Sequence, residues 1–302
     1  MAKPTLVISA GDPAGIGPEV TVKALAQPEV RELAEIIVCG DPAQLRGLPS
    51  VRVEPAGDAA GVQPGKRSAA GGAAAVAAIK RAVELIQAGE ADALVTGPIN
   101  KEALRLAGYP WPGHTEMLAD LCGVGEVRML LMGERLRVCH VTTHRSLRSA
   151  VDAATRARVL QTIRMTHEGG RRLGFERPRI AVAGLNPHAG EGGLFGDEEI
   201  REIAPAIADA QGEGIEVSGP WPADTLFWRA AAGEFDFVVA MYHDQGHVPV
   251  KLAGFDEGVN VTLGLPFLRT SVDHGTAFDI AGKGVARWQS MAAAIRVAAH
   301  TR

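Results

Sequence analysis

The sequence has few cysteines, no motif that pairs them, and no long apolar run. Its three cysteines, Cys39, Cys122 and Cys139, form no CxxC pair, so neither a zinc ribbon nor a disulfide framework is indicated. No apolar run approaches the roughly 20 residues that a membrane-spanning helix needs. The N-terminus also lacks the basic region, long apolar segment and cleavage site of an export signal. These absences predict a cytoplasmic protein with no membrane partner.

Neither sign of charge is in excess. The 31 Lys and Arg residues nearly balance the 35 Asp and Glu residues, which gives a formal net charge of -4. Such a chain carries no overall field that would gather a phosphate backbone or an anionic membrane surface. The GxGxxG dinucleotide fingerprint and the GxxxxGKS or GxxxxGKT phosphate loop are also missing. The composition therefore predicts no nucleic-acid partner.

What the sequence does contain is an alternation of short β-branched runs with longer Ala-rich or amphipathic segments. This alternation is typical of parallel strands joined by helical crossovers, so we predict an α/β fold. The length of 302 residues and the 46% hydrophobic composition suit one large or two moderate domains. The expected strands are 5–10, 35–39, 93–96, 127–132, 136–141, 179–183, 237–241 and 259–262. The clearest expected helices are 68–87, 154–173, 198–210 and 289–299.

No internal repeat and no Ser- or Gly-rich tether divides the chain, so two domains would have to be interleaved. We expect residues 1–125 and 266–302 to form a first α/β domain and residues 126–265 to form a second. Many of the 36 glycines and 18 prolines follow predicted strands. In an open α/β sheet the loops at the carboxyl ends of the strands bind ligands, so these loops are the first candidates for a site.

The first such loop is GDPAGIGPE, from Gly11 to Glu19. Pro18 and Glu19 are expected in the first turn of a helix, where proline costs no hydrogen bond. Closely spaced glycines let the backbone approach a ligand, but a tight structural turn would use the same residues. The loop alone leaves both interpretations open.

Three of the nine histidines follow predicted strands in Gly-, Pro- or Thr-rich surroundings: His144, His188 and His243. Three imidazoles at the carboxyl ends of separate strands can converge on a divalent metal ion and leave positions open for substrate or water. Each histidine taken alone is better explained as a hydrogen-bonded loop residue. Their shared position favours the metal site.

Other histidines are expected inside regular elements. His140 lies in an expected strand and His167 in an expected helix. His247 lies four residues after the third candidate ligand, but Gly246 and Pro249 argue against a helix there. We therefore expect no helical pair of histidine ligands of the HExxH kind.

Further polar residues suit an anionic ligand. The segment Gly113–Met117 is expected to open a helix whose free N–H groups can meet an anion, with Thr115 as its cap, although capping alone would explain Thr115. Lys251, Asn260 and Arg269 follow in an apolar, Gly-rich setting that looks like buried strand. An amide between two cations suits a phosphate or carboxylate, and a surface strand with solvated charges is the alternative.

The last candidate segment is polar and punctuated by glycine, and it runs from Asp273 to Gly284 into the final expected helix. Such a stretch can wrap a nucleotide through backbone contacts, with Asp279 available to ribose hydroxyls. Its chemistry alone is only moderately specific.

Together these segments resemble the 4-hydroxythreonine-4-phosphate dehydrogenase family over nearly the whole chain. The matching motifs, in the family's order, are GDPAGIGPE, TGPINKEAL, GHTEML, TTHRSLR, GLNPHAGEGGLFGDEE, PADTLF, MYHDQGHVPVK and GVNVTLGLPFLRTSVDHGTA. GDPAGIGPE and HGTAFDIAGKG also resemble the wider isocitrate and isopropylmalate dehydrogenase superfamily, in which the second segment helps to bind the nicotinamide cofactor. The resemblance implies a non-Rossmann α/β fold of two domains, usually a homodimer with active sites built from both subunits.

The resemblance also implies a role for each matching residue. The divalent-metal ligands would be His144, His188 and His243. The substrate contacts would be His114, Thr115, Lys251, Asn260 and Arg269. The cofactor contacts would be Gly11, Asp12, His274, Gly275, Thr276 and Asp279. The candidates for supporting or proton-transfer roles are Lys101, Asp224 and Asp244.

The implied reaction is the metal-dependent oxidation of a 4-phosphorylated 3-hydroxy acid by NAD, with NADP as an alternative, followed by loss of CO2. The metal would be zinc, magnesium, cobalt or manganese. The first domain would carry the cofactor contacts and the second the metal and dimer contacts. The favoured substrate is 4-phosphohydroxy-L-threonine, which would give 3-amino-2-oxopropyl phosphate in pyridoxal phosphate biosynthesis.

One segment departs from the family's pattern. Residues 51–78 look shorter than in the vitamin B6 enzymes, which resembles a paralogous branch acting on 4-phospho-D-threonate or 4-phospho-D-erythronate. The family also includes dehydrogenases of cyclic diol carboxylates, but Lys251, Asn260 and Arg269 favour a phosphorylated substrate. Phosphate acyltransferases share the broad fold, and a metallohydrolase could use the same histidines. Neither class needs HGTAFDIAGKG, and the full set of matched residues disfavours a non-catalytic binding module.

Overall fold

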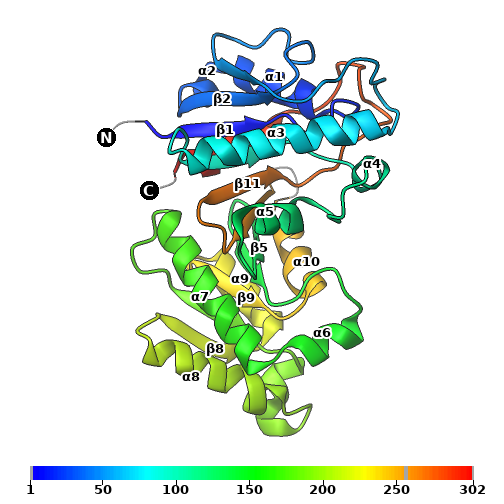
Figure 1. The fold of residues 1–302 in the computed structure, drawn as a ribbon. Coiled ribbons are helices and arrows are strands. Elements are labelled where there is room, and N and C mark those ends of the chain that lie inside the picture. Colours follow the sequence, from blue (N-terminus) through cyan, green and yellow to red (C-terminus); the bar gives the residue numbers. More distant parts are fainter. Residues whose placement is uncertain (1–2, 255–257, 301–302) are drawn as a thin grey trace. The chain divides into compact units, whose positions relative to one another are not determined.

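The computed structural model describes residues 3–254 and 258–300, which divide into two compact units (Figure 1). The first unit comprises residues 3–127 and 265–300, and the second comprises residues 128–254 and 258–264. The chain therefore leaves the first unit once and returns to it near its end. The expected domain limits at residues 1 and 302 lie outside the described residues.

The first unit is built around parallel strands in the order β3-β2-β1-β4-β11. These strands are β1 (Thr5–Ser9), β2 (Glu35–Gly40), β3 (Arg52–Pro55), β4 (Ala93–Thr96) and β11 (Leu268–Val272). The runs TLVIS of β1 and ALVT of β4 are almost wholly buried, as expected for central parallel strands that are covered on both faces. Because the strands are parallel, their carboxyl ends lie along one edge of the sheet.

Helices cover both faces of these strands. On one face α3 (Ala69–Gln87) packs against β1, β2 and β4, with Val7 and Leu94 in the shared core. On the other face α11 (Gln289–Ala299) packs against β1, β4 and β11, and the Thr270 hydroxyl donates to the carbonyl of Ala294 at 2.9 Å. The remaining helices of this unit are α1 (Gly17–Ala26), α2 (Pro28–Arg31), α4 (Lys101–Leu106) and α5 (His114–Cys122).

Side-chain caps fix where several helices begin. The Ser68 hydroxyl accepts from the N–H of Gly71 at 3.1 Å at the start of α3, and the Asn100 side chain accepts from the N–H of Ala103 at 2.9 Å at the start of α4. These caps satisfy N–H groups that the first turn of a helix leaves without an intrahelical partner. Pro18 occupies the first turn of α1, as predicted.

The second unit contains a mixed sheet in the order β10-β5-β6-β9-β7-β8. Its strands are β5 (Arg128–Met132), β6 (Arg137–His140), β7 (Ile180–Ala183), β8 (Val217–Trp221), β9 (Phe237–Ala240) and β10 (Val259–Leu263). β6, β9, β7 and β8 are parallel, whereas β5 is antiparallel to β10 and to β6. The carboxyl ends of β6, β9 and β7 therefore lie next to one another.

Helices also flank this sheet. α7 (Arg156–Arg172) contacts β5, β6, β7, β9 and β10. α9 (Ala223–Ala231) and α10 (His243–Ala253) share a core with Val138, Ala181 and Val238 of the central strands. The other elements are α6 (Leu147–Ala153), α8 (Ala204–Gly212), the 3-10 segment η1 (Pro187–Gly193) and the π-helical segment η2 (Glu199–Ile203).

The predicted α/β class is confirmed, and each of the eight expected strands lies within one residue of its expected ends. The helix expected at 289–299 is correct, whereas the one expected at 198–210 is divided into η2 and α8. Three strands were missed: β3, β8 and β11. β8 contains Gly219 and Pro220, and β3 and β11 contain charged or polar residues, so none gives a clear apolar strand pattern. None of the helices in the described ranges is long and apolar enough to cross a membrane.

Candidate active site

Three segments that are far apart in the sequence meet at the carboxyl-end edge of the first unit. The N–H of Asp12, after β1, donates to the carbonyl of Pro98, after β4, at 2.9 Å. The N–H of Ile16 donates to the carbonyl of Thr276, after β11, at 3.0 Å. The fold thus brings GDPAGIGPE and HGTAFDIAGKG into direct contact.

Glycine is required where these segments touch. A Cβ atom on Gly15 would lie 2.8 Å from the Cβ of Thr276, and one on Gly17 would lie 2.2 Å from a backbone carbonyl oxygen. Gly11 has a φ of +84°, and a Cβ atom there would lie 2.4 Å from the carbonyl oxygen of Pro98. This packing is the tight turn that the sequence left open as one interpretation of the loop.

Asp12 is fully buried in this loop. Its Oδ1 accepts from the N–H of Ala14 at 2.9 Å, whereas its buried Oδ2 has no hydrogen-bond partner among the described residues. A Cβ atom on Gly71 would lie 2.8 Å from Oδ1, so the carboxyl group lies against the first turn of α3. Burial raises the pKa of Asp12, and the hydrogen bond from Ala14 opposes that shift. A donor on a bound molecule would find an acceptor at Oδ2.

β11 carries a buried arginine. Arg269 is 2% exposed, and its Nε and Nη2 donate to the hydroxyl oxygen of Thr96 at 3.1 and 2.6 Å. Its register beside Leu94 of β4 directs it to the face that α3 covers. Burial lowers the pKa of Arg269 to about 9, because the guanidinium cation has lost its hydration. A bound anion would replace that hydration with charge-assisted hydrogen bonds.

His114 is the first residue of α5 and lies near this cation. The backbone of Gly97 forms a hydrogen bond with its ring, whereas its buried Nε2 has no hydrogen-bond partner in the described part of the chain. Burial and the charge of Arg269 hold the pKa of His114 well below its usual range. The ring is therefore neutral at pH 7.

A cavity of about 100 Å³ adjoins these groups. It is lined by Thr96, Gly97, Pro98, Ile99, His114, Ser271, Val272 and His274. The Nδ1 of His274 lies 2.9 Å from the carbonyl oxygen of Gly275, and its buried Nε2 has no partner within residues 3–254 and 258–300. The volume corresponds to about three water molecules, and two imidazoles and two hydroxyl side chains line it. The cavity suits a small polar or anionic group.

The structure places the other predicted residues of the first unit less centrally. Thr115 does not cap α5, because Gly113 is the N-cap and Thr115 is the second residue of the helix; that prediction was wrong. Lys101 is exposed at the start of α4, and its Cε lies 3.9 Å from where a Cβ atom of Gly113 would be. Gly275 and Asp279 are exposed in the turns that follow β11.

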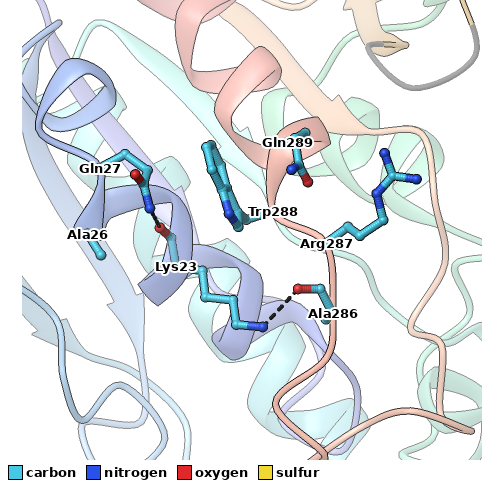
Figure 2. A pocket seen from close by; sticks show the side chains of 7 residues that line it. All are labelled: Lys23, Ala26, Gln27, Ala286, Arg287, Trp288 and Gln289. Carbon is cyan, nitrogen blue, oxygen red and sulfur yellow. Dashed lines mark hydrogen bonds between the residues drawn. The ribbon is translucent and has the colours of Figure 1, made fainter.

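A larger hollow of the first unit, of about 350 Å³, lies between α1 and the start of α11 (Figure 2). It is lined by Lys23, Ala26, Gln27, Ala286, Arg287, Trp288 and Gln289. The ammonium group of Lys23 contacts the Glu19 carboxylate at 2.7 Å and the carbonyls of Gly284 and Ala286 at 2.8 and 2.9 Å. No residue that was predicted to belong to the site is among the described residues of this lining. Lys23 therefore serves to join α1 to the segment before α11.

In the second unit the three predicted metal ligands follow three adjacent parallel strands. His144 follows β6, His188 follows β7 within η1, and His243 begins α10 after β9. The strand order β6-β9-β7 means that all three depart from the same edge of the sheet. His144 and His188 are exposed, and His243 is half-buried.

The structure brings two of these three rings together. The ring centroids of His144 and His243 are 5.6 Å apart, whereas the ring of His188 lies 6.2 Å from that of Phe195. Within the described residues, no group of three or more His, Cys, Asp or Glu side chains is close enough to hold a metal ion. His144 and His243 supply two imidazole donors of the kind that divalent metals such as zinc bind, against the three protein ligands of a typical catalytic zinc site.

The prediction that Gly246 and Pro249 prevent a helix is wrong. Both lie inside α10, which places His243 and His247 one turn apart with their rings stacked at 3.6 Å. A Cβ atom on Gly246 would lie 2.4 Å from Nε2 of His140, so the glycine lets α10 pack closely on β6. This packing outweighs the roughly 1 kcal/mol by which glycine disfavours a helix.

His140 occupies β6, as predicted, but the sequence gave it no role. It is 1% exposed, and its Nε2 lies 3.1 Å from Nδ1 of His247. Burial, assisted by the nearby His247, lowers the pKa of His140 to about 3. The ring is therefore neutral across the physiological range.

The remaining predicted residues of the second unit lie on three elements. Oδ1 of Asp244 lies 2.7 Å from Nδ1 of His243. Asp224 is exposed in the first turn of α9. Lys251 lies in the last turn of α10 and not in a strand, which corrects the expectation, whereas Asn260 lies in β10 as predicted.

The sequence analysis missed Glu199. This residue is 3% exposed, and its Oε1 accepts from the N–H groups of Leu185 and Asn186 at 2.7 Å each. Its Oε2 accepts from the side-chain amide of Asn186 at 2.9 Å. The consecutive acidic residues in GDEE were the available signal, but nothing in the sequence shows that one of them is buried.

These hydrogen bonds hold the loop that leads into a strained turn. Three non-glycine residues there have positive φ values of 53°, 52° and 43°: His188, Ala189 and Glu191. The left-handed conformation costs such residues roughly 1–2 kcal/mol each. Glu199 therefore stabilises the backbone from which His188 projects.

The chain is similar to known proteins over nearly its whole length. A family model described as pyridoxal phosphate biosynthetic protein PdxA matches residues 9–298. A D-threonate 4-phosphate dehydrogenase of Salmonella typhimurium is 47% identical over an alignment of 324 positions, gaps included, that covers 99% of this chain and 99% of that protein. A 4-hydroxythreonine-4-phosphate dehydrogenase of Geobacter metallireducens is 50% identical over an alignment of 322 positions, gaps included, that covers 98% of this chain and 95% of that protein. The crystal structure of a 4-hydroxythreonine-4-phosphate dehydrogenase from Klebsiella pneumoniae has a TM-score of 0.91 at 46% identity, covering 98% of this chain and 99% of that one.

More distant solved structures share the fold alone. A β-decarboxylating dehydrogenase from Thermococcus kodakarensis is 16% identical with a TM-score of 0.55. A branched-chain phosphotransacylase from Enterococcus faecalis is 15% identical with a TM-score of 0.59. The expected isocitrate and isopropylmalate dehydrogenase-like fold is thereby confirmed.

Proposed function

This chain belongs to the family of the pyridoxal phosphate biosynthetic protein PdxA, and on that premise we propose that it is a nicotinamide-dependent dehydrogenase of a 4-phosphorylated 3-hydroxy acid. The first substrate we propose is 4-phosphohydroxy-L-threonine, oxidised and decarboxylated to 3-amino-2-oxopropyl phosphate. The second is 4-phospho-D-threonate or 4-phospho-D-erythronate, which is favoured by the shortness of the segment over residues 51–78. The relative from Salmonella typhimurium bears the name of this second activity.

The observation that carries the proposal is the buried cation of Arg269 next to neutral His114. A guanidinium with a pKa lowered by burial gains most from an anion that restores its lost solvation. The backbone of Gly97 takes the N–H of the neutral His114 ring at Nδ1, so Nε2 is left to accept a hydrogen bond from a donor on the substrate, without adding a second charge. A phosphate or carboxylate of the substrate would satisfy Arg269, and a hydroxyl, ammonium or protonated phosphate oxygen beside it would satisfy Nε2 of His114. Thr115, Lys251 and Asn260 are proposed as further substrate contacts.

We assign the metal site to His144, His243 and His188. His144 and His243 supply two imidazole nitrogens, and Asp244 at Nδ1 of His243 leaves the opposite ring nitrogen for coordination. In a homodimer with shared sites, as we propose for this protein, residues of a second copy can complete the set. Zinc, magnesium, cobalt and manganese are the candidate ions.

We assign the nicotinamide cofactor, NAD or alternatively NADP, to the loops after β1 and β11. Gly11, Asp12 and Thr276 belong to the segments that touch each other, and Asp12 offers an acceptor oxygen. The same assignment includes His274, Gly275 and Asp279.

The chemistry needs a proton acceptor for the hydroxyl at C3. When bound, a divalent metal ion would polarise the oxygen at C3 and the cofactor would accept the hydride from C3. Lys101, Asp224 and Asp244 are the groups of this chain that we propose to take the hydroxyl proton or to support the groups that do. The resulting β-keto acid can then lose CO2. The C–C bond to the carboxylate breaks, and its electron pair remains on the carbon next to the ketone.

The test is the reduction of NAD by chelator-treated protein, followed by absorbance with and without each divalent metal. The substrates are 4-phosphohydroxy-L-threonine, 4-phospho-D-threonate and 4-phospho-D-erythronate. We expect turnover only with metal, and the substrate with the highest kcat/KM identifies the branch. Absence of turnover with all three substrates, with or without metal, would overturn the proposal. The phosphate acyltransferase alternative would then be favoured.

A further inference from the structure

A pair of histidines that no assignment above uses lies behind His243. The ring of His247 stacks on that of His243, with centroids 3.6 Å apart and 11° between the ring planes. Nδ1 of His247 lies 3.1 Å from the carbonyl oxygen of His243 and 3.1 Å from Nε2 of His140. His140 and His247 are both buried.

Two carbonyl oxygens decide where the protons lie on these rings. The carbonyl of His243 can only accept, so Nδ1 of His247 carries the proton and donates. The carbonyl of Met129, 3.4 Å from Nδ1 of His140, can also only accept, so Nδ1 of His140 carries its proton. Nε2 of His140 is then an acceptor for the N–H of His247. If Nδ1 of either ring lacked its proton, its lone pair would face a carbonyl oxygen, and neither atom could donate a hydrogen bond.

The backbone is shaped to allow this contact. A Cβ atom on Gly246 would lie 2.4 Å from Nε2 of His140 and 2.7 Å from a methyl carbon of Val138. Any side chain at this position would push α10 away from β6 and separate the two rings. Glycine at position 246 is a poor helix former, but it allows His247 to lie against His140.

We propose that His247 is a positioning residue for His243, and that His140 fixes the tautomer of His247. The stacked ring of His247 restricts rotation of the His243 side chain, and Asp244 at Nδ1 holds the other side. The proposal rests on the proposed function only in taking His243 as a metal ligand. Outer partners of metal-bound histidines typically contribute about 10- to 100-fold in metal affinity.

The test measures metal affinity without any substrate or cofactor. Chelator-treated protein is titrated with Zn²⁺ or Co²⁺ against a chromophoric competitor, and thermal unfolding verifies that each variant is folded. His247→Leu removes the ring and its hydrogen bonds and should weaken binding about 10- to 100-fold. His140→Leu removes the acceptor and should weaken binding by a smaller factor. His140→Gln keeps an oxygen acceptor near the position of Nε2 and should restore the wild-type affinity.

The matched control is His300→Leu. His300 is exposed in the first unit, and its Nδ1 lies 2.7 Å from the carbonyl of Arg296, four residues earlier, as Nδ1 of His247 does with His243. Its loss removes the same kind of local contact and should leave metal affinity unchanged. Nitrogen-15 NMR of the metal-free protein provides a second readout, in which His247 and His140 should both be protonated at Nδ1.

The outcomes separate the two proposals. If His243→Ala abolishes binding but His247→Leu binds as the wild type does, the positioning role is overturned and the metal assignment stands. If His243→Ala binds metal as the wild type does, the metal assignment of the proposed function fails. In that case a His247 ring protonated at Nε2 in the NMR spectrum would overturn the tautomer assignment as well.

Discussion

The candidate-site regions of the two units differ in how their buried polar atoms are hydrogen-bonded. In the first unit three buried atoms of the carboxyl-end loops have no hydrogen-bond partner among the residues that the structure describes: Oδ2 of Asp12, Nε2 of His114 and Nε2 of His274. In the second unit His140 and His247 contact each other, and Glu199 accepts three hydrogen bonds from Leu185 and Asn186. The buried residues near the candidate site of the second unit satisfy one another, and those of the first do not. Elsewhere the second unit also has unpartnered buried atoms among the described residues, Nε of Arg137 and Nδ1 of His167.

The difference has an energetic meaning. A buried polar group without a partner costs roughly 1–3 kcal/mol, whereas a satisfied one contributes to stability. Atoms that remain unsatisfied tend to lie where a ligand will bind. The polar residues of the first unit should therefore serve binding at the expense of stability, and those of the second should serve both.

The largest effect is expected from His188→Ala. If His188 is a metal ligand, metal-dependent turnover should be abolished, because a lost imidazole donor is not replaced by any atom of alanine. NAD reduction with saturating divalent metal measures this. The control is His167→Ala, which removes a half-buried histidine of α7 and should leave turnover within a few-fold of the wild type. Unchanged turnover in His188→Ala would remove this residue from the metal site.

The next largest effect is expected from Arg269→Met. Loss of the buried cation should lower kcat/KM by about 30-fold or more, since charge-assisted contacts of this kind contribute about 2–5 kcal/mol. The melting temperature should change little, because methionine fills similar space and removes a charge that was desolvated. Steady-state kinetics and thermal unfolding measure the two effects.

The second unit offers a matched control for this arginine. Arg128 is 4% exposed, and its Nε donates to the hydroxyl oxygen of Thr162 at 3.0 Å, as Arg269 does to Thr96. Arg128→Met should leave kcat/KM within a few-fold of the wild type. Equal losses of kcat/KM in both variants would show that Arg269 acts only through the fold.

Much of the fold followed from the sequence because buried parallel strands leave an apolar, β-branched pattern. The strands that were missed carry residues that hide this pattern, such as Arg269, Thr270 and Ser271 in β11. The helix over residues 243–253 was missed because propensity forbids glycine and proline there, whereas close packing on His140 requires the glycine. Tertiary contacts of this kind cannot be read from local composition.

The three candidate metal ligands were identified by residue type and by position after strands, and the structure puts them at the ends of those strands. Other candidates lie inside elements, such as Asn260 in β10 and Arg269 in β11. The sequence does not show which polar groups are satisfied. Burial of Glu199 and the contact of His140 with His247 depend on residues 13 or more positions away. Their roles became visible only with the fold.

Substitution of a buried carboxylate by its amide should change the free energy of unfolding with opposite sign in the two units. Glu199→Gln tests this in the second unit. Glutamine keeps one acceptor oxygen but turns an N–H donor toward the side-chain amide of Asn186. We expect a loss of about 1–3 kcal/mol in the free energy of unfolding, measured with urea. Glu198→Gln is the control, since Glu198 accepts a hydrogen bond from the same amide, at 2.7 Å, but is half-buried; its effect should stay within about 0.5 kcal/mol. Equal effects would mean that burial of Glu199 contributes nothing.

Asp12→Asn tests the first unit, where a small gain in stability is expected. Because burial raises the pKa of Asp12 in the folded state, the folded protein binds the proton more tightly than the unfolded chain does. Ionised Asp12 therefore costs stability at pH 7, and this cost disappears as the pH falls below the unfolded value of 3.8. Urea unfolding should show Asp12→Asn to be more stable than the wild type at pH 7, with the difference shrinking toward pH 4.

Asp41→Asn is the matched control. Oδ1 of Asp41 accepts from the N–H two residues later at 2.8 Å, as Oδ1 of Asp12 does, but Oδ2 of Asp41 also accepts, from the N–H of Ala59 at 2.8 Å. This variant should therefore lose stability. If Asp12→Asn lost as much stability as Asp41→Asn, the unpartnered oxygen of Asp12 would cost no free energy of folding. The contrast between the two units would then be wrong.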